Sequence, residues 1–141
     1  MAQNNQGLDS LEIWRKAVDY AVDICQNVIP LFPQEEKWAL ASQLRRSVQS
    51  IPANIAEGYG RYNFQETIHF CYIARGSMAE TKTHLIFAFR MGYINEEIFS
   101  RYLNQLNDLG RMTNGYIAHL RKQKAIDVLK ETPDPDKTYE I

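Results

Sequence analysis

The chain has 141 residues, of which 16 are basic and 17 acidic, so its formal net charge is −1. This length fits one domain with a substantial core, and 45% apolar residues are too many for a disordered protein. The longest uncharged apolar run, residues 85–89, is far too short to span a membrane, and the first residues lack the pattern of a signal peptide. We therefore expect a cytoplasmic protein whose cysteines, Cys25 and Cys71, are buried thiols and not a disulfide.

Charge is unevenly distributed along the chain. Residues 125–141 hold five acids and two bases (net −3), whereas residues 1–124 hold 14 bases and 12 acids (net +2). We predict a helical domain over residues 1–124 and an acidic, proline-containing, partly disordered tail over residues 125–141. Four bases and no acid lie near the end of the domain: Arg111, Arg121, Lys122 and Lys124. Such a run either complements a helix dipole or contacts phosphate.

Four long helical patterns follow one another, and the first covers residues 11–28, before Pro30 and Pro33. Its expected core face is Leu11, Trp14, Val18, Ala21, Cys25 and Val28. A second apolar line lies beside that face: Ile13, Ala17, Tyr20 and Ile24. Because a helix in a monomeric bundle needs one apolar stripe, the surplus favours homo-oligomerisation.

The second helix is predicted over residues 34–58. Its expected core stripe is Trp38, Ala41, Leu44, Val48, Ile51 and Ile55. Pro52 lies inside this pattern and has no N–H to donate, so we expect a kink there, or a break at which Ser50 caps a second piece. Gly58 and Gly60 are expected to end the helix by taking positive φ.

The third helix is predicted to begin at Asn63, which forms a capping-box-like pair with Glu66, and to stop at Gly92. The fourth is predicted to begin at Asn95 and to run to about residue 124. No segment shows the alternation of a half-buried strand. The fold class is therefore all-α, an antiparallel up-down-up-down four-helix bundle. Three glycines inside these helices are expected to mark close helix crossings: Gly76, Gly110 and Gly115.

A polar line runs beside the core stripe of the second helix. It consists of Ser47, Ser50, Asn54 and Glu57. An unpaired buried polar group costs about 1–3 kcal/mol, so a line in this position must be hydrogen-bonded. It is either an internal network, with Arg75 and Glu80 as candidate partners, or a polar groove that meets a ligand.

Motifs for catalysis are weak. Glu66 and His69 have the Glu-x-x-His spacing of di-iron bundles, but the sequence has no second such pair, and capping is a sufficient role for Glu66. The histidines and cysteines lack zinc-site spacing, the serines lack a nucleophile elbow, and residues 58–61 lack the lysine of a P-loop. We expect no metal, no cofactor and no enzymatic activity.

The segment around the polar line also carries a family resemblance. Its most specific part is Ser-Ile-Pro-Ala-Asn-Ile-Ala-Glu-Gly at residues 50–58, and further matching runs lie at residues 11–17, 32–36, 43–47, 60–61 and 74–81. Over about residues 8–122 the chain resembles the bacterial four-helix bundle proteins encoded within intervening sequences of 23S ribosomal RNA genes. The resemblance implies a four-helix bundle, a ring-shaped homopentamer as in several members, and no established enzymatic activity.

More distantly, the chain is similar to the accessory protein of diversity-generating retroelements, a basic pentameric barrel that binds a reverse transcriptase and RNA. This similarity implies RNA or a nucleic-acid-handling protein as the partner. Because the present chain is near neutral, we expect a local patch, which is either the four bases named above or Arg45, Arg46 and Arg61 of the family motif. The alternative is a homo-oligomeric protein-interaction scaffold with no nucleic-acid role.

Overall fold

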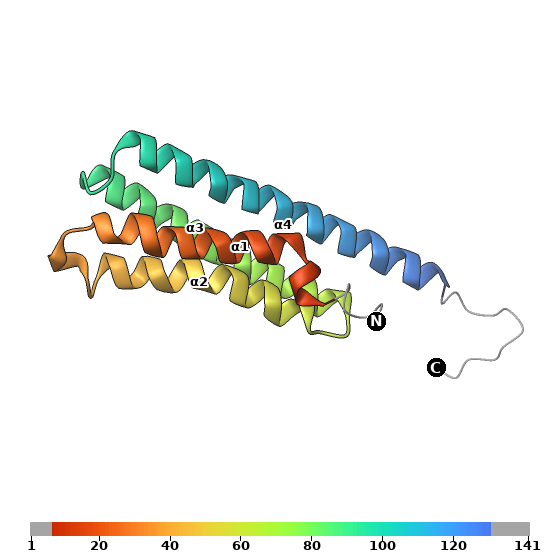
Figure 1. Ribbon diagram of the computed structural model, residues 1–141. Coiled ribbons are helices and arrows are strands. Elements are labelled where there is room, and N and C mark those ends of the chain that lie inside the picture. The colour runs from red at the N-terminus through yellow and green to blue at the C-terminus, as the bar shows by residue number, and fades with distance from the viewer. Residues whose placement is uncertain (1–6, 131–141) are drawn as a thin grey trace, which may run out of the picture.

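The computed structural model describes residues 7–130 and consists of four long helices with short connections (Figure 1). These helices are α1 (Glu12–Asp23), α2 (Leu40–Tyr59), α3 (Phe64–Arg90) and α4 (Glu96–Lys130). None of the described residues lies in a strand, so the prediction of an all-α fold with four helices is confirmed. Over the same residues, no helix has both the length and the apolar character that a bilayer crossing requires.

Short helical turns flank α1 and precede α2. The turn η2 (Leu8–Ser10) comes before α1, and the π-helical turn η3 (Ile24–Val28) and the 3-10 turn η4 (Ile29–Leu31) follow it. Pro30 lies in η4, and the chain leaves the helical conformation at Phe32, where φ is −74° and ψ is 148°. The first helical pattern therefore closes at the prolines, as the sequence predicts.

The core face predicted for α1 is wrong at four of its six positions, since only Ala21 and Val28 of that face are buried as predicted. The line that was expected to be surplus is buried: Ile13, Ala17, Tyr20 and Ile24, together with Ala21 and Val28. Leu11, Trp14, Val18 and Cys25 are only half-buried, and Leu11, Trp14 and Cys25 pack against the edge of the core. The two lines are similarly apolar, so the sequence alone does not distinguish them. The buried line differs in having a long-range partner, because the buried Tyr20 hydroxyl donates to the Tyr102 main-chain oxygen of α4 at 2.9 Å.

The start of the second helix is also wrong. Residues 34–36 form the 3-10 turn η5 (Gln34–Glu36), and α2 begins only at Leu40. Trp38 therefore lies outside the helix with 84% of its surface exposed, instead of in the core stripe. A break at Pro52 does not occur either, because α2 is continuous from Leu40 to Tyr59 and the fixed φ of proline is compatible with a helix.

Side-chain caps begin the last two helices. Asn63 Oδ1 accepts a hydrogen bond from the Glu66 N–H at 2.8 Å, and Asn95 Oδ1 accepts one from the Ile98 N–H at 2.9 Å. After α3, Gly92 takes a φ of 78°, a conformation that glycine adopts without a steric penalty. Helix α4 continues to Lys130, so residues 125–130 of the predicted tail are helical, and the remainder of that tail lies outside the described residues.

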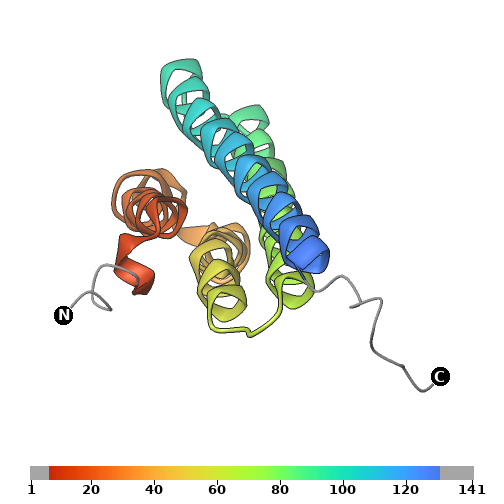
Figure 2. The same ribbon diagram turned by 90° about the vertical axis from the view of Figure 1, so that its right-hand side faces the viewer.

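Two hydrophobic clusters hold the helices together. The larger one combines residues of all four long helices, and its fully buried members include Ile24, Leu44, Ile51 and Leu85. The smaller one joins α3 to α4 alone and consists of Ile68, Cys71, Ile117 and Leu120. Figure 2 shows the consequence: α1 lies beside α2, whereas α4 follows α3 along its length. The α3–α4 pair thus has a core of its own at one end of the molecule.

Helices α2 and α3 approach closely at Gly58. The pairs Ser47–Thr81 and Gly58–Thr67 show that the two helices run in opposite directions. A Cβ added to Gly58 would lie 2.8 Å from the Cβ of Phe70 and 3.1 Å from the main-chain oxygen of Thr67. Gly58 is needed for this contact and not for a positive φ, which Gly92 alone adopts among the described residues.

The close crossings predicted at three other glycines are wrong. A Cβ added to Gly76, Gly110 or Gly115 would meet no heavy atom within 4 Å. These glycines face open space on α3 and α4, although each costs its helix about 1 kcal/mol relative to alanine.

Replacement of Gly58 and of Gly115 by alanine tests this difference. We expect Gly58→Ala to lower the free energy of unfolding by about 1–3 kcal/mol, because the new methyl group overpacks the α2–α3 contact. Gly115→Ala is the matched control and should raise it by about 0.5–1 kcal/mol through helix propensity alone. Urea unfolding followed by circular dichroism measures both, and a stabilised Gly58→Ala variant would contradict the packing argument.

Candidate nucleic-acid interface

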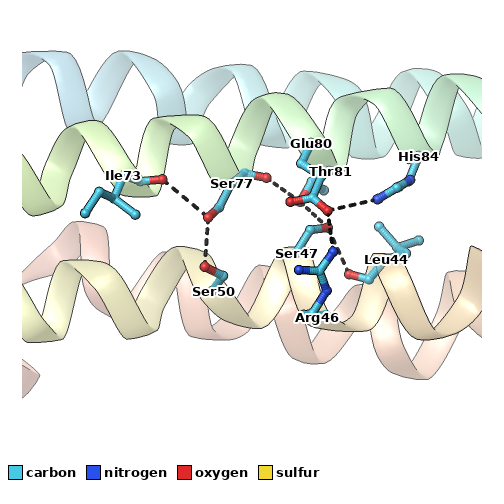
Figure 3. Close-up of polar contacts among 9 residues, drawn as sticks. All are labelled: Leu44, Arg46, Ser47, Ser50, Ile73, Ser77, Glu80, Thr81 and His84. Carbon is cyan, nitrogen blue, oxygen red and sulfur yellow. Dashed lines mark hydrogen bonds and ion pairs between the residues drawn. The ribbon is translucent and has the colours of Figure 1, made fainter.

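Hydroxyl side chains form a buried polar seam between α2 and α3 (Figure 3). The Ser47 and Thr81 hydroxyls lie 2.9 Å apart, and the Ser50 and Ser77 hydroxyls lie 2.8 Å apart. Each pair is further anchored to the main chain, since Thr81 donates to the Ser77 oxygen and Ser77 donates to the Ile73 oxygen. In the part of the chain that the structure describes, every buried side-chain nitrogen and oxygen has a hydrogen-bond partner.

A charged cluster lies at the edge of the seam. Arg46 of α2 donates to Glu80 of α3 at 2.9 Å, and the His84 Nε2 lies 3.4 Å from the same carboxylate oxygen. The Arg46 side chain is 70% exposed and that of Glu80 is 39% exposed, so water screens the ion pair and it stabilises the fold by at most about 1 kcal/mol.

The predicted polar line therefore divides into two parts. Its inner part is hydrogen-bonded within the protein, because Asn54 also donates to the Ser50 hydroxyl and main-chain oxygens, at 2.9 and 2.8 Å. Glu57 is exposed and pairs with Arg61 at 2.6 Å. Arg75, a candidate partner of this network, lies elsewhere and extends over the Tyr72 ring, 5.5 Å from its centroid. The sequence analysis did not identify the two partners that the line has on α3, which are Ser77 and Thr81.

The basic residues of the family motif do not form one patch. Arg45 lines a groove between α1 and α2, whereas Arg46 is paired with Glu80. Arg61 is paired with Glu57 and lies over the Phe70 ring at 4.9 Å. From Arg45 to the end of α2 the chain rises by roughly 20 Å, so these arginines occupy separate surroundings along the helix.

The other predicted basic residues lie along two grooves between α3 and α4. The end groove, of about 600 Å³, is lined by Gln65, Ile68, Tyr72, Arg121, Lys124, Ala125, Val128 and Leu129. The middle groove, of about 310 Å³, is lined by Arg75, Met78, Ala79, Lys82, Leu106, Asn107, Gly110, Arg111 and Asn114. Of the described residues that line the two grooves, five are basic and none is acidic. Lys122 is exposed on α4 but lines neither groove.

Local contacts determine how much of this positive charge is free. Arg111 is paired with Asp108 one turn earlier on α4, which neutralises part of its charge. The Lys124 Nζ donates to the neutral Gln65 amide oxygen across the end groove at 2.9 Å, and the Arg121 guanidinium lies 5.7 Å from the Tyr72 ring centroid. Neither of these contacts places an acidic group beside the cation. Arg75 and Lys82, which the sequence analysis did not assign to a basic patch, are added to it by α3.

The opposite side of α4 has the opposite charge. A groove of about 320 Å³ between α1 and α4 is lined by Asp19, Asp23 and Asp108, with Lys16 as its basic residue. The Tyr102 hydroxyl donates to Asp23 at 2.7 Å, and burial together with this hydrogen bond raises the pKa of Tyr102 to about 12. Helix α4 therefore separates an acidic groove from the two basic ones.

The described residues offer little for catalysis. Burial raises the pKa of the Cys71 thiol to about 11, so its thiolate is scarce at neutral pH. Cys25 and Cys71 are both free thiols, as predicted, but only Cys71 of the two is buried, whereas Cys25 is half-buried. No group of three or more histidine, cysteine or acidic side chains within residues 7–130 is arranged to hold a metal ion.

A double-mutant cycle tests the polar seam. Ser47→Ala and Thr81→Val should each lower the free energy of unfolding by about 1 kcal/mol, because each removes one side of a buried hydrogen bond. The double variant should cost at least about 0.5 kcal/mol less than the sum of the two single changes. Glu57→Leu, at an exposed site, is the control and should change stability by no more than about 0.5 kcal/mol. Strict additivity in urea unfolding would contradict the Ser47–Thr81 coupling.

Comparison with known proteins gives the chain a family. The family model described as 23S rRNA-intervening sequence protein matches residues 9–115. A crystal structure of a protein of unknown function from the S23 ribosomal protein family of Bacteroides thetaiotaomicron VPI-5482 is 25% identical, with a TM-score of 0.68. The match covers 74% of this chain and 97% of that protein. No curated protein matches. Since the family model spans most of the chain and includes the residues of the polar seam, the protein belongs to the 23S rRNA-intervening sequence protein family.

Proposed function

We propose that this protein is a non-enzymatic RNA-binding module, acts as a homo-oligomer and contacts RNA through the two grooves between α3 and α4. The observation that carries the proposal is the lining of these grooves, which contains five basic side chains and no acidic one among the described residues. A surface that attracts phosphate needs local positive potential and not a basic protein overall. A net charge of −1 is therefore compatible with RNA binding.

The spacing of the basic residues suits a nucleic-acid backbone. Arg111, Arg121 and Lys124 belong to one helix, and the rise from the first to the last is roughly 20 Å. Asn107 and Asn114 line the middle groove between the cations and supply neutral hydrogen-bond donors. Such a row can follow several consecutive phosphates. The distant similarity to the accessory protein of diversity-generating retroelements, which binds RNA, supports RNA as the nucleic acid.

We further propose that the oligomer is a homopentamer, in line with the family resemblance. Several large apolar side chains of the described surface are exposed, including Val22, Leu31, Trp38, Phe87 and Met91. Leu31, Trp38 and Met91 lie in or beside the connections at one end of the bundle, where Tyr93 joins the two connections by donating to Glu36 at 3.0 Å. Apolar surface gathered in this way favours contact between copies.

A protein-interaction scaffold is the second candidate. The groove between α1 and α2 has a volume of about 490 Å³ and is lined mainly by apolar side chains, among them Trp14, Val18 and Pro52. An apolar groove of this kind suits a protein partner better than a phosphate backbone.

Charge reversal tests the RNA proposal. We expect Arg121→Glu with Lys124→Glu to weaken binding to structured RNA at least tenfold at low salt. The salt slope should become shallower by about 0.7–0.9 for each phosphate that the variant no longer neutralises. Arg45→Glu with Arg61→Glu is the matched control, carries the same change in charge and should bind like the unaltered protein. Fluorescence anisotropy across a salt series measures both, and mass measurements verify that each variant keeps its oligomeric state.

Two results would contradict the assignment. Equal binding by the two double variants would show that net charge, and not the α3/α4 grooves, governs the affinity. No binding of the unaltered protein at low salt would remove the RNA proposal itself and favour the scaffold.

Native mass spectrometry tests the oligomer, and the expected species contains five chains. Trp38→Lys should shift the distribution towards smaller species, because it places a charge on the exposed apolar end of the bundle. Tyr62→Lys alters an even more exposed aromatic residue in the connection between α2 and α3 and should leave the distribution unchanged. A monomer at micromolar concentration would overturn the pentamer.

A further inference from the structure

An exposed tyrosine lies between two arginines on the α3/α4 face. Tyr72 of α3 is 39% exposed and lines the end groove. The Cζ of Arg75, one turn further along α3, lies 5.5 Å from the centroid of its ring, and the Cζ of Arg121, from α4, lies 5.7 Å from it. Two cations from two helices therefore converge on one accessible aromatic ring.

This arrangement is more than the fold requires. The small α3–α4 core already joins the two helices through Ile68, Cys71, Ile117 and Leu120. A cation–π contact at an exposed site adds little stability, and neither arginine has an acidic partner among the ion pairs of residues 7–130. The ring and both guanidinium groups thus remain available to a ligand.

The neighbouring space fits a flat heterocycle. The end groove beside Tyr72 is also lined by the apolar side chains of Ile68, Val128 and Leu129. Gly76, one turn from Tyr72 on the same helix, has no atom within 4 Å of the position that a Cβ would occupy. An aromatic ring, apolar side chains beside it and open space on one side are the surroundings in which proteins stack nucleobases.

We propose that Tyr72 is a base-stacking platform and that the end groove binds single-stranded RNA, an inference that rests on the RNA-binding function proposed above. A nucleobase stacks on the Tyr72 ring in place of one guanidinium, because base stacking on an aromatic ring is stronger than an exposed cation–π contact. The displaced arginine then pairs with a phosphate, for which its planar group can supply two hydrogen bonds. Lys124 contacts the next part of the backbone from the edge of the groove.

The platform predicts a preference between RNA structures. Bases within an A-form duplex are stacked on each other, so their faces are covered, and the deep, narrow major groove keeps side chains from their edges. Single strands, loops and bulges leave bases free to stack on Tyr72. Duplex RNA can contact only the cations of the two grooves, so its binding depends on Arg121 and Lys124 but not on the tyrosine ring.

Substitution of Tyr72 separates the ring from the charges. With a 12-nucleotide single-stranded oligouridine or oligoadenosine probe, Tyr72→Ala should lose roughly 5- to 100-fold in affinity, the range that corresponds to one stacked base. Tyr72→Phe keeps the ring and should bind like the unaltered protein. Tyr62→Ala, which removes a tyrosine that is exposed away from the grooves, is the control and should also retain full affinity. Tyr72→Ala should bind a 12-base-pair duplex RNA as the unaltered protein does.

The outcomes distinguish this inference from the proposed function. If Tyr72→Ala binds the single strand normally while Arg121→Glu with Lys124→Glu does not, the stacking platform is wrong and the RNA interface stands. Tighter binding of the duplex than of the single strand by the unaltered protein would also overturn the platform. If the unaltered protein binds neither probe at low salt, both the proposed RNA-binding function and the stacking platform are wrong.

Discussion

The packing of α2 against α3 is the constraint on which the rest of the structure depends. Small hydroxyl side chains line their interface, with Ser47 1% exposed and Thr81 fully buried. Small residues let two helices approach closely, but they bury little apolar area. The close contact therefore stabilises the fold only if each buried hydroxyl is hydrogen-bonded. Pairing across the interface, with main-chain carbonyls as second acceptors, meets that condition. Gly58 extends the close contact to the end of α2.

The positions of the outer helices follow from this inner pair. Helix α1 packs on α2, and α4 packs on α3. Contact between α1 and α4 centres on Tyr20 and Tyr102, whose ring centroids lie 6.3 Å apart. Because α4 is longer than α1 and has its own small core with α3, one end of the α3–α4 pair carries surface that α1 does not cover. The end groove forms on that surface, between the first turns of α3 and the last turns of α4.

Sequence periodicity was sufficient for the helices but not for every face. The starts of α3 and α4 and the stop at Gly92 follow from local caps and conformational preferences, which act over a few residues. The core face of α1 could not be chosen, because both of its apolar lines satisfy the helical period and a long-range partner decides between them. Trp38 was misplaced for a similar reason: an apolar residue at the right spacing looks like core even where the chain is not yet helical.

The candidate interface was predictable in part. A run of bases on one helix is visible in sequence, and Arg111, Arg121 and Lys124 do line the α3/α4 grooves. The contribution of α3 was not visible, because Arg75 and Lys82 precede that run by some 30 residues and meet it only through helix packing. Lys122 belongs to the run of bases but does not line a groove. One position along a helix rotates a side chain by about 100°, which turns Lys122 out of the groove that Arg121 lines.

The separation of charge across α4 explains how a nearly neutral chain can present a cationic surface. Acids gather in the α1/α4 groove, and bases gather on the α3/α4 side. A helix with its side chains is about 10 Å across, whereas the screening length at physiological ionic strength is about 8 Å. The two sides are thus separated by more than a screening length, and the aspartates cancel little of the potential in the basic grooves. Arg111 is the exception, because Asp108 lies within contact distance of it on the ridge between the two sides. The strongest attraction for phosphate is therefore at Arg121 and Lys124, beside the exposed ring of Tyr72.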